Sequence, residues 1–578
     1  MKNEKDAVLV RKVFLAMLVP TILMNTVTCI TALADTIIVG NFLGESALAS
    51  ITFSTPAYML INTLAALIAV GGTTLMSIAI GSGNKEESDE IFSLMMLLGV
   101  ITGVVFAFMG AMFIDPIVKI LGARGELAEL TREYALIVFY FTPVIVMNIA
   151  LAFIVRCDGR PNLAMAGMLA AIIANIVLDL IFIIPFQMGV AGAAWATGAS
   201  QAISAAIIAT HFYSKKNTLK FVKPSLSKSI SIFKGGAGTS LHFVYQFIAI
   251  LFFNNFIMQL AGGVGIVVYT VVMNVSTVAM SIFEGLSQTV QPMFSVYHGE
   301  GNNKAIKATY RLSLTATLVL GGAVTAILLL FPHALVKAFG VTDVSAMSMS
   351  VAAIRIFSVS IILMTFNVIM GYYYQSTERV VLAAVIVALR NLAALLLGVI
   401  VLGGLFGING IWGAYIFAEI ATFAAWFAYV KRKERAEGAC DGILLLPSQP
   451  DVYSRYLSAD LEELHAVIGE IKLFFDERGA DETLAARVML AVDELVANVI
   501  MHGGKKGLNH IEVRIVLKDE ILLVIRDDGI LFDHSAFAGT KPIREGGHGL
   551  KLIHKTASSF EYRPALGLNR TLVKYRNC

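Results

Sequence analysis

The sequence has little charge and few cysteines. Of its 578 residues, 15% are charged and 57% are hydrophobic, and the mean hydropathy is +0.76. A soluble domain carries about 25% charged residues, so this composition excludes a single water-exposed globule and a disordered chain. The four cysteines form no Cys-x-x-Cys pair and have no histidine at metal-ligand spacing, so we expect free thiols and no zinc site. A net charge of +3 argues against a nucleic-acid partner.

Long apolar runs replace charge over the first three quarters of the chain. About 20 apolar residues cross a bilayer as a helix. We therefore predict an all-α membrane protein with twelve transmembrane helices, at residues 14–40, 47–80, 91–114, 134–155, 164–185, 189–213, 237–260, 264–296, 312–331, 350–374, 380–402 and 408–430. The first run is too long for a cleaved signal, so we expect it to remain as the first span.

Basic residues concentrate in the connections that follow even-numbered spans. Because loops rich in Lys and Arg stay in the cytoplasm, the pattern predicts a multi-pass protein of the cytoplasmic (inner) membrane, with both termini and the polar tail inside. Few basic residues lie in the odd-numbered connections. The basic residues that set this orientation are Lys85, Arg156, Arg160, Lys215, Lys216, Lys220, Lys223, Lys228, Lys234, Lys304, Lys307, Arg311 and Arg379.

The membrane region repeats itself when the sequence is shifted by 218 residues. This shift places Gly44 on Gly262, the run 81–84 on 299–302, and the run 189–192 on 407–410. Six spans per repeat give both repeats the same membrane orientation, so we predict two parallel six-helix repeats related by an axis along the bilayer normal. The predicted domains are an N-terminal bundle (1–218), a C-terminal bundle (219–435), a linker (436–450) and a polar domain (451–578).

Six charged residues fall inside the predicted spans, where each costs roughly 2.5 to 3.5 kcal/mol. Asn175 and Asp179 lie four residues apart and therefore share one helix face. Oxygen ligands of this kind hold Na⁺ or a proton. A structural polar plug is the alternative for the two aspartates, and mutual ion pairs are the alternative for the other four. The six residues are Asp35, Asp179, Glu284, Arg355, Arg390 and Glu419.

Several motifs resemble those of multidrug and toxic compound extrusion (MATE) transporters, over about residues 10–435. The resemblance implies that a cation site in the first bundle is formed by Asp35, Asn175, Asp179 and Thr197. The second bundle departs from this pattern, because the repeat partners of Asp35, Asn175 and Asp179 are Phe253, Ala393 and Leu397; Glu284 is a candidate second acid. The motifs are Ala34-Asp35-Thr36-Ile37-Ile38-Val39-Gly40, Arg156-Cys157-Asp158-Gly159-Arg160-Pro161, Asn175-Ile176-Val177-Leu178-Asp179 and Gly189-Val190-Ala191-Gly192.

The polar tail has the pattern of a soluble α/β domain. Two amphipathic helices, at 461–477 and 485–502, precede two strands at 511–517 and 521–525. The chain has no G-x-x-x-x-G-K-[ST] motif, which excludes a P-loop motor. Three other motifs can bind a nucleotide, because a carboxylate one turn from an amide suits Mg²⁺ and a glycine-rich helix start suits phosphates. They are Asp493-Glu494-Leu495-Val496-Ala497-Asn498, Asp527-Asp528-Gly529 and Gly546-Gly547-His548-Gly549.

Together these motifs resemble the two-layer GHKL (Bergerat) ATP-binding fold, and most of all the anti-sigma-factor serine/threonine kinases. The resemblance implies ATP and Mg²⁺ as cofactors, with Glu494 as the catalytic base and Asn498 as a Mg²⁺ ligand. It also implies adenine and phosphate contacts from Asp527, Gly529, Gly547, Gly549 and Thr571. Whether this domain is an ATPase, a protein kinase or an ATP sensor stays open.

The predicted function is an antiporter that exports organic cations or related amphiphiles in exchange for H⁺ or Na⁺ and carries a cytoplasmic ATP-binding regulatory or kinase domain. The alternative is a transporter-like receptor that controls a kinase acting on a cytoplasmic protein. A lipid-precursor flippase is disfavoured, because the acidic and amide residues of the first bundle match the extrusion family.

Overall fold

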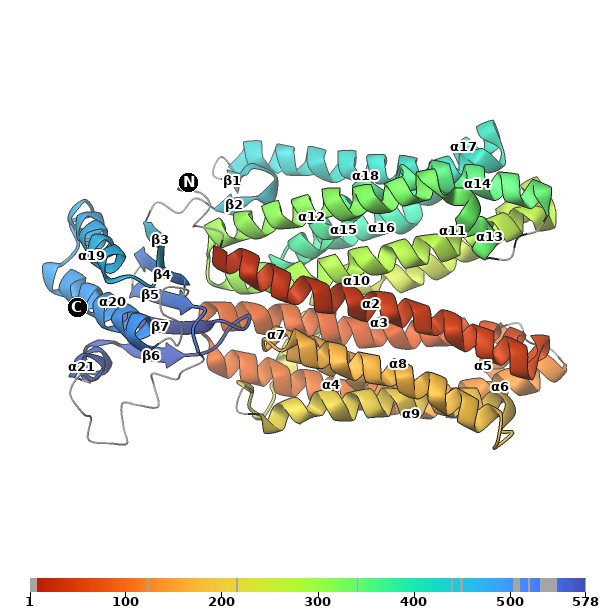
Figure 1. The fold of residues 1–578 in the computed structure, drawn as a ribbon, viewed down its shortest axis with the longest axis horizontal. Coiled ribbons are helices and arrows are strands. Elements are labelled where there is room, and N and C mark those ends of the chain that lie inside the picture. The colour runs from red at the N-terminus through yellow and green to blue at the C-terminus, as the bar shows by residue number, and fades with distance from the viewer. Residues whose placement is uncertain are drawn as a thin grey trace.

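The computed structural model describes residues 8–121, 123, 125–214, 217–339, 341, 343–437, 440–447, 451–502, 510–517, 520–530 and 548–576. A long helical part and a smaller α/β part make up the molecule (Figure 1). The helices of the long part run along the longest axis, and the α/β part covers one end of them. The first helix begins at this same end (Figure 1). The start of the helical part and the α/β part therefore lie at one end of the molecule.

In the described residues, the first half of the helical part contains eight helices. There are more helices than predicted spans because one predicted connection contains a short helix and one predicted span divides into two helices. The eight helices are α2 (Val8–Leu43), α3 (Glu45–Ser82), α4 (Lys85–Met112), α5 (Ile114–Leu121), α6 (Glu126–Tyr140), α7 (Thr142–Cys157), α8 (Pro161–Ile183) and α9 (Gly189–Ala209).

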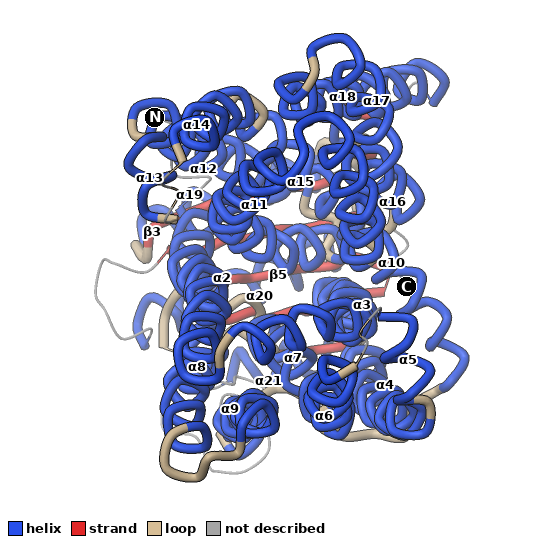
Figure 2. The backbone as a smooth tube through the Cα atoms, turned by 90° about the vertical axis from the view of Figure 1, so that its right-hand side faces the viewer, coloured by secondary structure: helices blue, strands red, loops and turns tan. Residues whose placement is uncertain are grey.

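The second half follows the same plan. Its helices are α10 (Ser229–Ser240), α11 (His242–Gly299), α12 (Asn303–Leu330), α13 (Pro332–Ala338), α14 (Val344–Ser358), α15 (Ile361–Ser376), α16 (Val380–Ala388), α17 (Ala394–Phe406) and α18 (Ile408–Glu437), with a π-helical turn, η3 (Leu389–Ala393), between α16 and α17. A break at Gly262 divides the longest of them, α11, into two helical segments. Seen along the helices, the two halves form two groups, and strand β5 lies behind their junction (Figure 2).

Among the described residues, nine helices are long and apolar enough to cross a membrane, or eleven if two bent helix pairs each count as one span. The two pairs, α6 with α7 and α14 with α15, coincide with the predicted fourth and tenth spans. The predicted sixth span coincides with α9, which is outside that set. Its many Gly, Ala and Ser residues lower the hydropathy of this 21-residue helix.

Glycines in the left-handed region punctuate both halves at the same places. Gly44 and Gly262 have φ of 84° and 59°, and Gly83 and Gly301 have 75° and 63°. These pairs are 218 residues apart, so the shift found in the sequence has a conformational cause: the chain must turn there with a φ that favours glycine. α4 and α12 begin and end 218 residues apart as well. The 218-residue repeat that relates the two helical halves is thereby confirmed.

The α/β part is a five-stranded antiparallel sheet with helices on one face. The sheet order is β3-β4-β5-β7-β6, and helices α19–α21 lie beyond it, away from the membrane helices (Figure 1). The predicted helices and strands of this part are confirmed within a few residues. The elements are β3 (Val452–Ser458), α19 (Leu461–Asp476), α20 (Glu482–His502), β4 (His510–Leu517), β5 (Glu520–Asp527), α21 (His548–Thr556), β6 (Ser559–Tyr562) and β7 (Asn569–Arg576); a two-stranded ribbon, β1 (Cys440–Asp441) and β2 (Leu446–Pro447), precedes them.

Alternation along the strands gives the sheet two different faces. Val513, Ile515, Leu523, Ile525 and Val573 join the apolar core that the sheet forms with α19 and α20. The residues between them point to the opposite face, toward the membrane helices. This arrangement leaves one face for the nucleotide motifs and the other for the helical part.

Candidate functional site

The predicted cation site of the first half lies on α8. The buried residues of α8 lie along one stripe of the helix, because positions three or four apart share a helix face. They are Ala164, Gly167, Ala171, Asn175, Asp179 and Ile183. Asp179 is fully buried and Asn175 is 7% exposed. The structure therefore brings the predicted amide and carboxylate to one buried surface of the first half.

The other two predicted ligands lie on neighbouring helices. Thr197 is half-buried on α9, and its Oγ1 donates to the carbonyl oxygen of Ala193 at 3.0 Å. Asp35 lies on α2, which packs against α8, but its side chain is outside the described residues. The three helices of the prediction are thus adjacent, and the contact of Asp35 with the other ligands stays a prediction.

Two of the four charged residues predicted within the spans of the second half form an ion pair. Arg390 Nε donates to Glu419 Oε1 at 2.6 Å, and Asn367 Nδ2 donates to Glu419 Oε2 at 2.8 Å. Arg355 is exposed on α14. For Arg390 and Glu419 the ion-pair alternative is therefore the observed arrangement.

Glu284, the candidate second acid, lies beside this pair. Its Oε2 accepts a hydrogen bond from Tyr372 Oη at 2.9 Å. Glu284, His242, Arg390 and Asn391 line a cavity of about 30 Å³. A cavity of this size holds about one water molecule. In this conformation it has no room for an organic substrate, but it has room for a water next to an acid.

Arg156 lies elsewhere than the sequence predicts. The sequence places it in a basic connection, yet it is 1% exposed at the end of α7. Its Nη1 donates to Gln288 Oε1 at 2.8 Å across the two halves, and its guanidinium stacks over Phe153 at 4.3 Å. Sequence spacing could not reveal this, because Arg156 and Gln288 meet only when the two halves pack.

Two of the three nucleotide motifs have described residues on the helix-covered side of the sheet. Asp527, at the end of β5, is 4% exposed. Its Oδ1 accepts hydrogen bonds from Gly529 N at 2.9 Å and from Asn569 Nδ2 at 2.7 Å. Burial raises the pKa of the Asp527 carboxyl above its ordinary value. Asn569 is a residue that the sequence reasoning did not assign to the site.

Thr571 and the two α20 residues lie on the same side of the sheet. Thr571 pairs with Ile525 in the β5–β7 register. Ile525 is two residues before Asp527, so Thr571 and Asp527 point to the same face of the sheet. Thr571 is 4% exposed. Glu494 and Asn498 are half-buried one turn apart on α20. Gly547 lies outside the described residues, and Gly549 is the second residue of α21.

These residues fit a purine nucleotide with its metal. A buried carboxylate held by an amide and a backbone N–H is preorganised to accept a hydrogen bond from an exocyclic amine. Glu494 and Asn498 supply the oxygen donors that Mg²⁺ prefers. When bound, Mg²⁺ would neutralise phosphate charge, with Asn498 holding it and Glu494 orienting the attacking group.

The nucleotide motif also contacts the first membrane helix. Lys12 Nζ on α2 donates to Asp528 Oδ2 at 2.8 Å. Burial raises the pKa of Asp528, but hydrogen bonds from Lys12 and His510 outweigh burial and leave that pKa lowered. A side chain next to the predicted adenine contact therefore joins the α/β part to the helical part.

Two family models match the chain. The model described as MatE matches residues 20–181 and 239–400, one copy in each half. The model described as a histidine kinase-like ATPase domain matches residues 457–574. The duplicated match agrees with the two repeats, and the second match covers the sheet and helices that carry the nucleotide motifs.

Curated relatives align with the helical part. The multidrug export protein MepA of Staphylococcus haemolyticus is 26% identical over 421 residues, covering 72% of this chain and 92% of its own. MepA of Staphylococcus aureus (strain NCTC 8325 / PS 47) is 25% identical over 431 residues, covering 73% and 95%. These alignments leave about a quarter of this chain uncovered.

Solved structures share the fold of the helical part. An outward-facing multidrug resistance MATE family transporter superposes with a TM-score of 0.70 at 24% identity, covering 74% of this chain and 96% of that chain. A transporter of the MOP superfamily from Pyrococcus furiosus superposes with a TM-score of 0.69 at 24% identity, covering 75% and 98%. The chain is a multi-pass membrane protein that belongs to the MatE family and carries a histidine kinase-like ATPase domain at its C-terminal end.

Proposed function

We propose that this protein exports organic cations or related amphiphiles across the cytoplasmic membrane in exchange for H⁺ or Na⁺. The observation that carries the proposal is the buried stripe of Asn175 and Asp179 on α8, in a helical part that aligns with multidrug export proteins. A buried carboxylate is expensive in a bilayer and is retained where it performs a task. The coupling residues are Asp35, Asn175, Asp179 and Thr197.

Coupling runs through the first half in this proposal. The repeat positions of Asp35, Asn175 and Asp179 in the second half carry no oxygen ligand. Arg390 and Glu419 neutralise each other there. Glu284 is the remaining candidate for a second acid, since it lines the small cavity.

The C-terminal part is proposed to bind Mg-ATP and to act as a regulatory or kinase domain on the cytoplasmic side. Asp527, Thr571, Gly529, Gly547 and Gly549 would hold the nucleotide. Glu494 would orient the attacking group and Asn498 would hold the metal. A cytoplasmic protein is the substrate if the domain transfers phosphate.

The alternative proposal is a receptor whose helical part controls the kinase activity of the tail. The Lys12–Asp528 bond favours communication between the two parts, which either function requires. The two proposals differ in the effect of Glu494→Ala. An exporter with this substitution still transports under an ion gradient, whereas a receptor loses its cellular output.

The test is efflux of a fluorescent organic cation from proteoliposomes under an imposed H⁺ or Na⁺ gradient, with and without Mg-ATP on the side of the tail. Gradient-driven efflux that Asp179→Asn abolishes would support the exporter. Absence of efflux across a panel of cations under both gradients, together with phosphorylation of a partner protein, would establish the receptor instead.

A further inference from the structure

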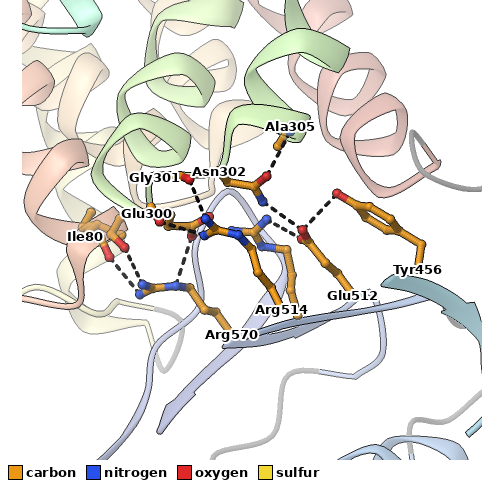
Figure 3. Close-up of polar contacts among 11 residues, drawn as sticks. Ile80, Glu300, Gly301, Asn302, Ala305, Tyr456, Glu512, Arg514 and Arg570 are labelled. Carbon is orange, nitrogen blue, oxygen red and sulfur yellow. Dashed lines mark hydrogen bonds and ion pairs between the residues drawn. The ribbon is translucent and has the colours of Figure 1, made fainter. Parts of the chain in front are cut away.

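The face of the sheet opposite the nucleotide motifs carries buried charges. Glu512, Arg514, Arg526 and Arg570 are each at most 2% exposed. Burying a guanidinium is costly unless its donors are bonded. The partners of these residues are therefore informative, and several of them lie at the ends of the membrane helices (Figure 3).

Arg570 binds the end of α3 in the first half. Its Nη1 donates to the carbonyl oxygen of Ile80 at 2.8 Å, and its Nη2 donates to that of Gly81. The last carbonyls of a helix lack partners within the helix and lie at the negative end of its dipole. A guanidinium is well suited to this position, because its donors form a rigid fork.

Arg514 binds the end of α11 in the second half. Its Nη1 donates to the carbonyl oxygen of Glu300 at 2.7 Å, and its Nη2 donates to that of Gly301. Residues 80–81 lie in the last turn of α3, and residues 300–301 directly follow α11. The 218-residue shift superposes these two helix ends, with the two contacts displaced by two residues along the chain. One sheet face thus binds the same structural element of both halves.

A buried network strengthens the second contact. Asn302 Nδ2 donates to Glu512 Oε1 at 2.8 Å, and Tyr456 Oη donates to the same oxygen at 3.0 Å (Figure 3). Arg526 donates to both Glu300 and Glu512. Arg570 Nε lies 3.1 Å from Glu300 Oε1, so the carboxylate of the second half also contacts the arginine that binds the first.

The helix ends held by the sheet are themselves in close contact. A Cβ atom added at Gly81 would lie 2.1 Å from the carbonyl oxygen of Val296, and one added at Gly299 would lie 2.1 Å from that of Ile78. These two contacts are also related by the repeat. The backbones of α3 and α11 therefore touch at the end that carries the ATP-binding domain, and the two halves are closed against each other there.

We propose that the sheet of the ATP-binding domain is a lock on the cytoplasmic gate. The inference rests on the proposed function in one respect, that the halves must separate at this end to admit substrate. β5 lies between β4 and β7, so the backbones that carry Arg514 and Arg570 are held about 10 Å apart. Hydrogen-bonded strands cannot stretch to follow two halves that separate. Opening of this end requires the sheet to release at least one half.

The chemistry of the contact suits repeated release. Arginines that leave the helix ends regain water, which offsets part of the cost of undocking. The sheet side also packs Tyr456, Leu566 and Leu568 into the apolar core of the helical part, and release exposes these side chains. Charge-assisted hydrogen bonds supply directional strength while the sheet is docked. The contact is therefore directional while the sheet is docked, and its charged groups are solvated again when the sheet leaves.

The nucleotide site lies on the reverse side of the same strands. Asp527 follows Arg526 on β5, and Asn569 precedes Arg570 on β7. A nucleotide that orders Asp527 and Asn569 acts on strand ends that hold the gate. We therefore include in the proposal that nucleotide binding changes the fraction of molecules in which the lock is closed.

The lock is tested by labelling a thiol introduced into the gate. Ser295 on α11 is 0% exposed, and Ser295→Cys adds little volume. The substitution is made in the full-length chain with the four native cysteines replaced by serine. A membrane-impermeant maleimide is applied to vesicles whose outer surface carries the ATP-binding domain, so that the reagent reaches the introduced thiol only when this end opens.

We expect the double substitution Arg514→Ala, Arg570→Ala to raise the labelling rate about tenfold. Arg455→Ala is the matched control, because Arg455 lies on the same sheet but pairs with Glu470 of α19. Its labelling rate should stay at the wild-type value. Equal rates in the folded double variant and the parent, or an equal rise in the Arg455→Ala control, would overturn the lock.

Two further measurements keep the test decisive. If the double alanine variant does not fold, the labelling rate of the double variant Arg514→Lys, Arg570→Lys is measured instead and should rise in the same way. Lysine keeps the positive charge but cannot donate two parallel hydrogen bonds as a guanidinium does. Mg-ATP should change the labelling rate of the parent about fivefold or more, and Asp527→Asn should abolish that change; an unaltered rate would overturn the nucleotide link. Labelling needs no substrate, so failure of the proposed transport would leave this result intact.

Discussion

Asn569 on β7 donates its side-chain amide to Asp527 Oδ1 on β5 at 2.7 Å, and the two residues face each other in the strand register. The same amide donates to the carbonyl oxygen of Ile530 at 3.0 Å. Asn569 therefore joins the end of the strand to the segment that follows it. This makes Asn569 the positioning residue for the proposed adenine contact.

Nucleotide binding should depend on both members of this pair. We expect Asn569→Ala to weaken binding of a fluorescent ATP analogue by about tenfold, because a hydrogen bond to a charged group is worth about 1.5 to 3 kcal/mol. Asp527→Asn should weaken it at least as much. Ser558→Ala is the control, since Ser558 Oγ donates to the carbonyl oxygen of Lys574 at the exposed edge of the sheet. Unchanged affinity in Asn569→Ala would remove Asn569 from the site.

The affinity for nucleotide should fall as the pH is lowered. Burial raises the pKa of Asp527 above the ordinary aspartate value of about 3.9. The carboxylate proposed to accept a hydrogen bond from the adenine amine therefore becomes protonated at a higher pH than a free aspartate. Lowering the pH has the opposite effect on the folding stability contributed by Asp527. Ionisation of a group with a raised folded pKa costs folding free energy, and this cost disappears as the pH falls.

Titrations with the ATP analogue between pH 7 and about pH 4.5 measure this dependence. The wild-type affinity should decline over the range, while Asp527→Asn binds weakly at every pH. Thermal unfolding measured in parallel separates binding from loss of the fold. A decline of the same size in Asp527→Asn would assign the titration to another group.

Ion coupling should require the buried carboxylate of α8. Asp179→Asn preserves the shape of the side chain but removes its charge, so we expect gradient-driven efflux to fall by at least about tenfold, and Asp35→Asn to do the same. Asp115→Asn is the control, because Asp115 forms an exposed pair with Arg132. Glu284→Gln tests whether the second half provides the coupling site. If this substitution abolishes efflux while Asp179→Asn does not, coupling lies in the second half.

The pair Arg390–Glu419 should act on stability. Arg390→Met leaves Glu419 buried without its counter-ion, which costs about 3 to 5 kcal/mol of unfolding free energy. The double variant Arg390→Met, Glu419→Gln removes both charges and should recover most of the loss. Thermal unfolding of the purified protein measures both variants. A double variant as unstable as Arg390→Met would contradict a simple ion pair.

The sequence by itself determined the apolar helices, the repeat and the strands of the tail. Hydrophobic periodicity reports burial within one element, and the glycines at 44 and 262 report a local backbone requirement that each repeat meets independently. The nucleotide motifs were also visible, because Asp527-Asp528-Gly529 and the α20 residues are short and contiguous. Asn569 was missed, because its role depends on a strand pairing with Asp527.

Only the tertiary structure decided how distant segments meet. Arg514 and Arg570 look in the sequence like polar residues on the solvent face of an antiparallel strand, and Arg156 looks like part of a basic loop. Each is buried because a partner more than a hundred residues away supplies an acceptor. A charge is stable in an interior only where such acceptors converge, and that convergence is a property of packed halves and a docked sheet, which no local pattern encodes.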